Sequence, residues 1–208
     1  MEDVLDVYAE PPDPLRPKIC FDETPKQLIA ETRQPLPGRP GQPERFDYEY
    51  RRNGTCNLFM MFQPGAGWRH AKVTNQRKKS DFAECLRELV DVHFPHAEKI
   101  RVVMDNLNTH TPASLYTAFP PAEARRILSK LEFHYTPKHA SWLNMVEIEL
   151  SVLVHQCLKR RIPDRDTLTG QVAAWEAARN TQRATIRWQF DLTQARTKLS
   201  RFYPQLPS

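Results

Sequence analysis

The chain has 208 residues, of which 40% are hydrophobic and 10% aromatic, enough to bury one sizeable core and to exclude a disordered chain. Lys and Arg outnumber Asp and Glu by 30 to 25, and the net charge of +5 permits a polyanionic partner without requiring one. No apolar run approaches the roughly 20 residues of a membrane span. The four cysteines have no zinc-site spacing and no signal peptide opens the chain, so we expect a cytoplasmic protein with free thiols.

Three strands are expected in the N-terminal part of the chain. Residues 1–17 are acidic and rich in proline, and we interpret them as a linker or a frayed end. Lys18–Asp22 is predicted to be a buried strand that ends in an acid. Residues 32–52 are rich in Pro, Gly and Arg and predict a long loop. Thr55–Gln63 and Trp68–Asn75 are the next two strands, and the three together are expected to form an antiparallel meander.

Helices alternate with two further strands in the rest of the chain. Apolar residues at helical spacing predict a helix over Ser80–Phe94, with Ser80 as its cap. A helix that crosses between strands favours a parallel neighbour, so the next strand, Lys99–Asp105, is expected to run parallel to its neighbour. The later elements are a helix over 122–131, a strand over Leu131–Pro137, and helices over Ser141–Lys159 (with Ser141 as N-cap), Asp164–Asn180 and Thr193–Phe202. This order predicts an α/β fold with a mixed sheet and helices on its faces.

Two acids follow apolar strands in this scheme. If the first and fourth strands are adjacent and parallel, Asp22 and Asp105 project from the same edge of the sheet. A turn-forming aspartate is the alternative for either residue taken alone. The polar residues that follow each acid, among them Glu23, Asn106 and His110, favour a binding site instead.

A third acid is expected from the helix over Ser141–Lys159. Glu147 and Glu149 point about 160° apart on a helix, so they cannot serve one site together. Glu147 borders the apolar stripe beside Asn144 and Ser151, which suits a residue facing a cleft, and we choose it over Glu149. An ordinary surface glutamate is the alternative for both. Two Asp and one Glu form an oxygen-only site that suits two Mg²⁺ or Mn²⁺ ions, with Asp22 as the bridging ligand.

Three stretches of the sequence resemble one protein family. The stretches "CFDET", "VVMDNLNTH" and "YTPKHASWLNMVEIELSVL" are similar to the DDE transposases of bacterial insertion sequences related to the mariner elements. These enzymes belong to the RNase H-like, retroviral-integrase superfamily. The resemblance implies a mixed five-stranded sheet flanked by helices, and Mg²⁺-dependent DNA cleavage and strand transfer at transposon ends. Asp22, Asp105 and Glu147 fall on the three acids of the family motif.

The resemblance also implies an organisation and partners. It covers about Lys18–Pro204, and we divide the chain into a linker at 1–17, a catalytic domain over 18–182 and a basic helical tail at 183–208. Such transposases carry helix-turn-helix modules ahead of this domain, so we expect a truncated copy or a separately encoded N-terminal DNA-binding fragment. The expected partners are DNA and a second copy of the chain, in the nucleoid of a bacterial cytoplasm. The family has a basic residue after its first Asp-Glu pair, where this chain has Thr24.

Several other residues are candidates for contact with DNA. Lys138 and His139 precede the helix with Glu147 and are expected to reach the phosphate backbone, and the long loop presents Arg51 and Arg52. His110 is expected to touch phosphate or position a water, with a locally hydrogen-bonded histidine as the alternative. For Trp142 (in "SWLN"), packing in the core is favoured over stacking on a base or sugar. The alternative functions are an RNase H-like nuclease and an inactive remnant that binds DNA or dimerises as a regulator.

Overall fold

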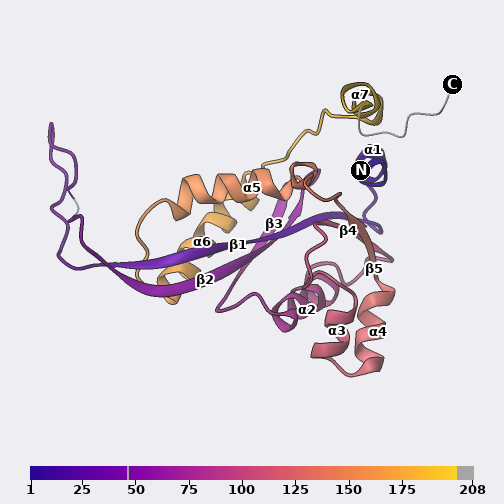
Figure 1. Cartoon of the computed structure of the whole chain (residues 1–208), viewed down its shortest axis with the longest axis horizontal. Coiled ribbons are helices and arrows are strands. Elements are labelled where there is room, and N and C mark those ends of the chain that lie inside the picture. The colour runs from indigo at the N-terminus through magenta and orange to yellow at the C-terminus, as the bar shows by residue number, and fades with distance from the viewer. Residues whose placement is uncertain (46, 201–208) are drawn as a thin grey trace.

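The computed structural model describes residues 1–45 and 47–200, which form one five-stranded sheet with helices on both faces (Figure 1). The spatial order of the strands is β3-β2-β1-β4-β5. β1 pairs antiparallel with β2, and β2 with β3, whereas β4 runs parallel to both β1 and β5. This confirms the predicted meander and the parallel neighbour. The strands are β1 (Lys18–Glu31), β2 (Tyr50–Gln63), β3 (Trp68–Thr74), β4 (Ile100–Met104) and β5 (Leu131–Tyr135).

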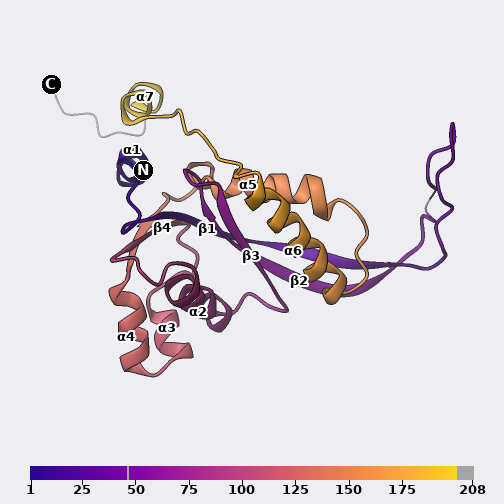
Figure 2. The ribbon, with the colours of Figure 1, turned by 180° about the vertical axis from the view of Figure 1, so that it is seen from behind.

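The helices form two layers, which Figures 1 and 2 show from opposite sides. α5 (Val146–Leu153) and α6 (Arg165–Thr181) cover one face of the sheet. The other face carries α2 (Lys79–Glu88), α3 (Ala113–Ala118) and α4 (Pro121–Ser129). Short turns continue or precede these helices: η1 (Leu89–His93), η2 (Ser141–Leu143) and η3 (Val154–Leu158). No helix in the described ranges is long and apolar enough to span a membrane.

Alternation along the strands separates the core into two clusters. Because successive side chains of a strand point to opposite faces, Cys20 and Val103 pack on the face that carries α5 and α6. Ile19, Phe21 and Val102 pack on the other face, with the apolar side chains of α2. The inner strands β1 and β4 are therefore buried on both sides, and their register decides which polar side chains emerge at the sheet edge.

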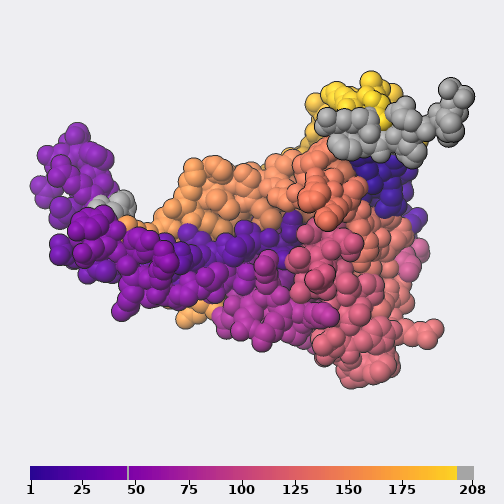
Figure 3. Space-filling view, in the orientation of Figure 1, coloured from indigo at the N-terminus to yellow at the C-terminus, as the bar shows by residue number. Residues whose placement is uncertain are grey.

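A long arm, formed by the outer halves of β1 and β2, is the largest departure from the sequence-based scheme. β1 does not end at Asp22, and residues 50–54 belong to β2 rather than to the predicted loop. The arm stands out from the body in Figures 1 and 3. Many of its side chains are exposed, and the apolar alternation that predicts a strand is limited to the buried Leu28, Ala30 and Cys56. Phe46, inside the predicted loop, lies outside the described residues.

The N-terminal segment is not a linker over its whole length. It contains α1 (Glu2–Ala9), whose Val4, Leu5 and Val7 are buried in the same cluster as the inner strands. The sequence-based scheme missed this helix because its three apolar residues lie in an acidic, proline-rich segment. α1 also contacts α7 (Leu192–Lys198). The predicted last helix ran to Phe202, which lies with the rest of 201–208 outside the described residues, and the division of the chain at 17/18 and 182/183 stays a prediction.

The starts of two helices differ from the predicted caps. Asp81, not Ser80, stabilises the start of α2, because its carboxylate accepts a hydrogen bond from the backbone N–H of Lys78 at 2.8 Å. Ser141 does not cap a long helix, since the backbone leaves helical geometry at Asn144 before α5 begins. α3 was not predicted at all.

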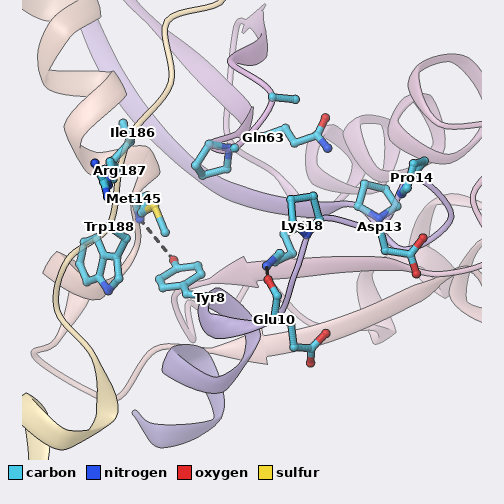
Figure 4. Close-up of a pocket in the computed structure, with 15 residues that line it drawn as sticks. Tyr8, Glu10, Asp13, Pro14, Lys18, Gln63, Met145, Ile186, Arg187 and Trp188 are labelled. Carbon is cyan, nitrogen blue, oxygen red and sulfur yellow. Dashed lines mark hydrogen bonds between the residues drawn. The ribbon is translucent and has the colours of Figure 1, made fainter.

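A cavity of about 510 Å³ lies between residues 8–18, the turn at 63–66 and residues 186–188 (Figure 4). Tyr8 packs edge-on against Trp188 at a centroid distance of 5.5 Å, and its hydroxyl donates to the carbonyl oxygen of Leu143 at 2.9 Å. The backbone N–H of Met145 donates to the same hydroxyl at 3.4 Å. These contacts tie the N-terminal helix to the segment that leads into α5.

Candidate active site

The register of β1 and β4 brings the two predicted aspartates to one place. Cys20 and Val103 are partners in the parallel ladder, and both point to the α5 face. Asp22 and Asp105 each lie two positions further along, so strand alternation directs both toward that face. The parallel ladder ends at Cys20, while Asp22 remains paired with Met60 of β2. Asp22 thus lies where β4 leaves the sheet, although its own strand continues.

The buried side chain of Asn144 holds Glu147 next to Asp22. Nδ2 of Asn144 donates to the carbonyl oxygen of Phe21 at 2.9 Å. Its own carbonyl accepts from the backbone N–H of Glu147 at 3.1 Å. The first turn of α5 is therefore joined to β1 immediately before Asp22, which sets Glu147 beside that carboxyl group.

Asp22, Asp105 and Glu147 line one cavity of about 490 Å³. The full lining consists of Asp22, Glu23, Thr24, Arg77, Asp105, Leu107, Ser141, Glu147, Leu150, Ser151 and Val154. Glu149 is not in it. The Glu149 side chain is 1% exposed and lies 2.9 Å from Nε of Arg69 and 2.8 Å from Arg179. The two glutamates face opposite sides of α5, as the helical phase predicted.

The three carboxyl groups are electrostatically coupled. The pKa of Asp22 is raised to about 7, chiefly by burial and also by the charges of Glu23, Asp105 and Glu147, against a hydrogen bond from the backbone of Glu23 that lowers it. The pKa of Asp105 is instead lowered, chiefly by the hydrogen bond from His110. The cavity therefore holds acids that repel one another, an arrangement that a cation stabilises.

The donor set fits a hard divalent cation, but the side chains are not arranged as a finished metal cluster. In the described part of the chain, no three acidic, histidine or cysteine side chains converge closely enough to hold a metal ion. The prediction that the three carboxyl groups meet within metal-bridging distance is not met. Two of them make local hydrogen bonds instead: Asp22 accepts from the backbone of Glu23 at 2.8 Å, and Asp105 contacts His110 at 2.6 Å. Carboxylate oxygens alone still match the preference of Mg²⁺ and Mn²⁺.

Comparison with known proteins places the chain in a family. The model of the DDE superfamily endonucleases matches residues 17–169, which include all three acids of the cavity. The chain belongs to the DDE superfamily of endonucleases. A search of curated proteins found no match.

Two solved structures share the fold of this DDE-family chain. One is a Mos1 transposase paired-end complex with the left transposon end, with a TM-score of 0.54 and 14% identity, over 82% of this chain and 52% of that one. The other is the Mos1 mariner paired-end complex with Mn, with a TM-score of 0.58 and 14% identity, over 87% and 55%. The chain thus spans about half the length of these structures. Its sheet and helices form the RNase H-like fold that the resemblance implied.

Arg77 is a residue of the cavity that the sequence analysis did not assign to the site. It lies in the segment between β3 and α2, and its guanidinium is 3.7 Å from the carboxylate of Glu23. We expected a basic residue at the position of Thr24, and Arg77 lines the cavity together with Thr24. The run of basic residues at 77–79 can be seen in the sequence, but only the fold shows that Arg77 lines the same cavity as the acids.

His110 is not a surface contact for DNA, so that prediction is wrong. Its side chain is 0% exposed and packs against the rings of Phe21 and Phe82. Both ring nitrogens face carboxylates: Nδ1 is 2.6 Å from Asp105, and Nε2 is 2.9 Å from Glu23. The alternative of a locally hydrogen-bonded histidine describes it better.

The other predicted DNA contacts are exposed but lie in different places. Lys138 and His139 occupy the exposed segment between β5 and η2, close in sequence to Ser141 of the cavity lining. Arg51 and Arg52 are exposed on β2 opposite Ala30 and Ile29, so they lie roughly 25 Å along the arm from Asp22. The structure therefore does not bring these two arginines to the acids.

Trp142 is not a core residue, contrary to the interpretation that packing is its role. It is 46% exposed and lines a shallow groove with Ile148 and Val152, and this groove shares Ser141, Glu147 and Ser151 with the acid cavity. One edge of its ring meets Phe190 at a centroid distance of 5.3 Å. An apolar surface is thus continuous with the acids.

Proposed function

We propose that this DDE-family chain is the catalytic domain of a transposase, which cleaves and joins DNA strands at transposon ends in a reaction that depends on a divalent metal. The observation that carries the proposal is the meeting of Asp22, Asp105 and Glu147, from three separate elements, in one solvent-open cavity. The solved structures with the same fold bear titles that name a transposon end and Mn.

The residues of the cavity have distinct roles in this proposal. Asp22, Asp105 and Glu147 would hold the metal, and Asp22 lies between the other two in the sense that the charges of both act on it. Two Mg²⁺ or Mn²⁺ ions bound there would stabilise the attacking and leaving oxygens of an in-line phosphoryl displacement. Arg77, in the cavity lining, and the exposed Lys138 orient the phosphate backbone by charge.

The partners follow from the same proposal. Transposon ends and target duplex are the substrates, and a second copy of the chain holds the second end. Arg77, Lys138 and the exposed Arg51 and Arg52 bind phosphate without reading the base sequence, so DNA affinity falls steeply with salt. A separately encoded N-terminal fragment that reads the terminal repeats stays a prediction.

Cleavage assays with purified protein test the function. Duplexes taken from the DNA that flanks the coding sequence are incubated with Mg²⁺ or Mn²⁺, with and without a supplied helix-turn-helix fragment. We expect nicking or strand transfer by the wild type and its loss in Asp22→Ala, Asp105→Ala and Glu147→Ala, with DNA binding retained. The matched control is Glu98→Gln, an exposed acid outside the cavity lining.

Three outcomes contradict the proposal. Full activity in Asp105→Ala would show that the cavity is not the site. Preferential cleavage of an RNA–DNA hybrid over duplex DNA would indicate an RNase H-like nuclease. DNA binding without cleavage under every metal and fragment condition would indicate an inactive, regulatory copy.

A further inference from the structure

His110 links the two strands that carry the proposed metal ligands. It follows β4 in a tight turn, where its backbone N–H donates to the carbonyl of Leu107 at 2.8 Å. Its own carbonyl accepts from the hydroxyl of Tyr135 at 3.1 Å. The backbone and the ring are therefore both fixed, and the histidine cannot swing into the cavity without breaking these contacts.

The ring spans from one carboxylate to another across the sheet edge. Nδ1 lies 2.6 Å from Oδ1 of Asp105, at the end of β4, and Nε2 lies 2.9 Å from Oε2 of Glu23, on β1. Glu23 is only 4% exposed, and its backbone N–H donates to the carboxylate of Asp22 at 2.8 Å. One continuous series of polar contacts thus runs from Asp105 through His110 and Glu23 to Asp22.

The packing around the His110 ring does not by itself require a polar side chain. Phe21 and Phe82 enclose it at centroid distances of 5.6 and 4.9 Å, in a part of the core that an apolar ring would fill well. Burying a histidine and a carboxylate together costs desolvation, and apolar replacements of buried ion pairs are often neutral or stabilising. The two ring nitrogens nevertheless lie 2.6 Å from Asp105 and 2.9 Å from Glu23, so the carboxylates are what a polar ring serves at this position.

We propose that His110 is a positioning residue that orients Asp105 and sets its spacing from Asp22 for a divalent cation. This inference rests on the proposed function. Within the described residues, the hydrogen bonds to Asp105, from His110 and from the backbone of Leu107, both end on Oδ1. We assign the other oxygen, Oδ2, to the cation. Partners behind a metal ligand typically contribute 10- to 100-fold in metal affinity, on the order of what this contact is expected to supply.

Titration of Mn²⁺ into the metal-free protein, followed by the electron paramagnetic resonance signal of free Mn²⁺, tests this role without any DNA or cleavage. His110→Phe fills the space between the two phenylalanines but donates nothing. Because Glu23 stays buried without this partner, we expect the variant to unfold at a lower temperature than the wild type and, where folded, to bind Mn²⁺ about 10- to 100-fold more weakly. Wild-type affinity in this variant would overturn the inference and leave His110 as a packing residue.

Two amide variants separate the two ends of the bridge. The amide of His110→Asn branches from the same carbon as Nδ1 and can still reach Asp105, whereas that of His110→Gln lies nearer to the place of Nε2 and Glu23. Asn should retain most of the Mn²⁺ affinity and Gln should lose it. The opposite order, or equal affinities, would contradict the proposal, and this comparison decides the matter if His110→Phe does not fold.

The same titration keeps the two proposals apart. Asp105→Ala, run in parallel, removes a ligand rather than its support. If Asp105→Ala abolishes Mn²⁺ binding while His110→Phe does not affect it, only the positioning role fails. If the wild type binds no Mn²⁺, the proposed metal site fails and the role of His110 falls with it.

Discussion

Glu147 and Glu149 lie two positions apart on α5 and have opposite surroundings. Glu149 is buried and paired with Arg69 and Arg179, so its charge is balanced within the protein. Glu147 faces a cavity with Asp22 and Asp105. The side-chain type is the same, but only Glu149 has its counter-charges built into the fold.

The difference shows how this fold separates structure from chemistry. The guanidinium of Arg69, 0% exposed, also donates to Asn180 at 3.3 Å and to the carbonyl of Ala184 at 2.5 Å, so the cluster around Glu149 joins α5 to β3 and α6. Removing one member leaves a buried charge without a partner. In the acid cavity, by contrast, the carboxylates repel one another, so neutralising one of them costs no stability.

The largest expected effect is a loss of activity when Glu147 is replaced. Glu147→Gln keeps the shape of the side chain but removes a proposed metal ligand, so the rate of metal-dependent cleavage should fall by about 10³-fold or more. Thermal unfolding of the metal-free protein should be unchanged or shifted slightly upward. Cleavage within a few fold of the wild type would show that the cavity does not need this carboxylate.

Stability, unlike activity, is expected to depend on Glu149 rather than on Glu147. Glu149→Ala leaves Arg69 buried without its partner, and the free energy of unfolding should fall by about 3–5 kcal/mol in urea denaturation. The double variant Glu149→Met with Arg69→Met removes both charges and should recover much of the loss. A single variant as stable as the wild type would mean that the pair is not the support that its burial indicates.

A smaller effect is expected at the aromatic surface beside the acids. Trp142→Ala should weaken binding of single-stranded DNA by about 1–3 kcal/mol, because the exposed ring lies on a groove continuous with the cavity and offers a face for a base. Fluorescence anisotropy at several salt concentrations measures this. Tyr116→Ala, an equally exposed aromatic on α3, is the matched control and should have no effect. Equal losses in both variants would remove any special role for Trp142.

Helical phase and strand order carried most of the sequence-based scheme. The separation of Glu147 from Glu149 followed from the phase of α5, which is regular from Val146 onward. The parallel direction of the fourth strand followed from the crossover helix α2, whereas its adjacency to the first strand was a condition, which the structure meets. Both rules are local, and so both survive without knowledge of the packing.

What sequence reasoning missed depends on contacts between distant residues. The interruption before α5 exists because Asn144 bonds to Phe21 on β1, and nothing in "SWLN" indicates that partner. For His110 the sequence left open a phosphate contact, a water-positioning role and a local hydrogen bond, and only the fold shows that Glu23 and Asp105 hold the ring inside. Arg77 reaches the cavity only through the placement of the segment after β3.

The smallest predicted effect is a pH dependence of stability that comes from Asp22. Its pKa of about 7 in the folded protein exceeds the unfolded value near 3.8, so between these pH values the folded state binds more protons. The contribution of Asp22 to stability therefore falls as pH rises from about 4 to 7, by no more than about 2 kcal/mol after allowing for its partial exposure. Urea denaturation of metal-free protein at pH 5 and pH 8 should show the wild type losing this amount relative to Asp22→Asn, which has no proton to release. The sign is opposite to that of Asp105, whose pKa is lowered, so only the difference between the two proteins isolates Asp22. Parallel pH profiles would show that the Asp22 carboxylate is already balanced, as Glu149 is, and would remove the contrast between the two regions.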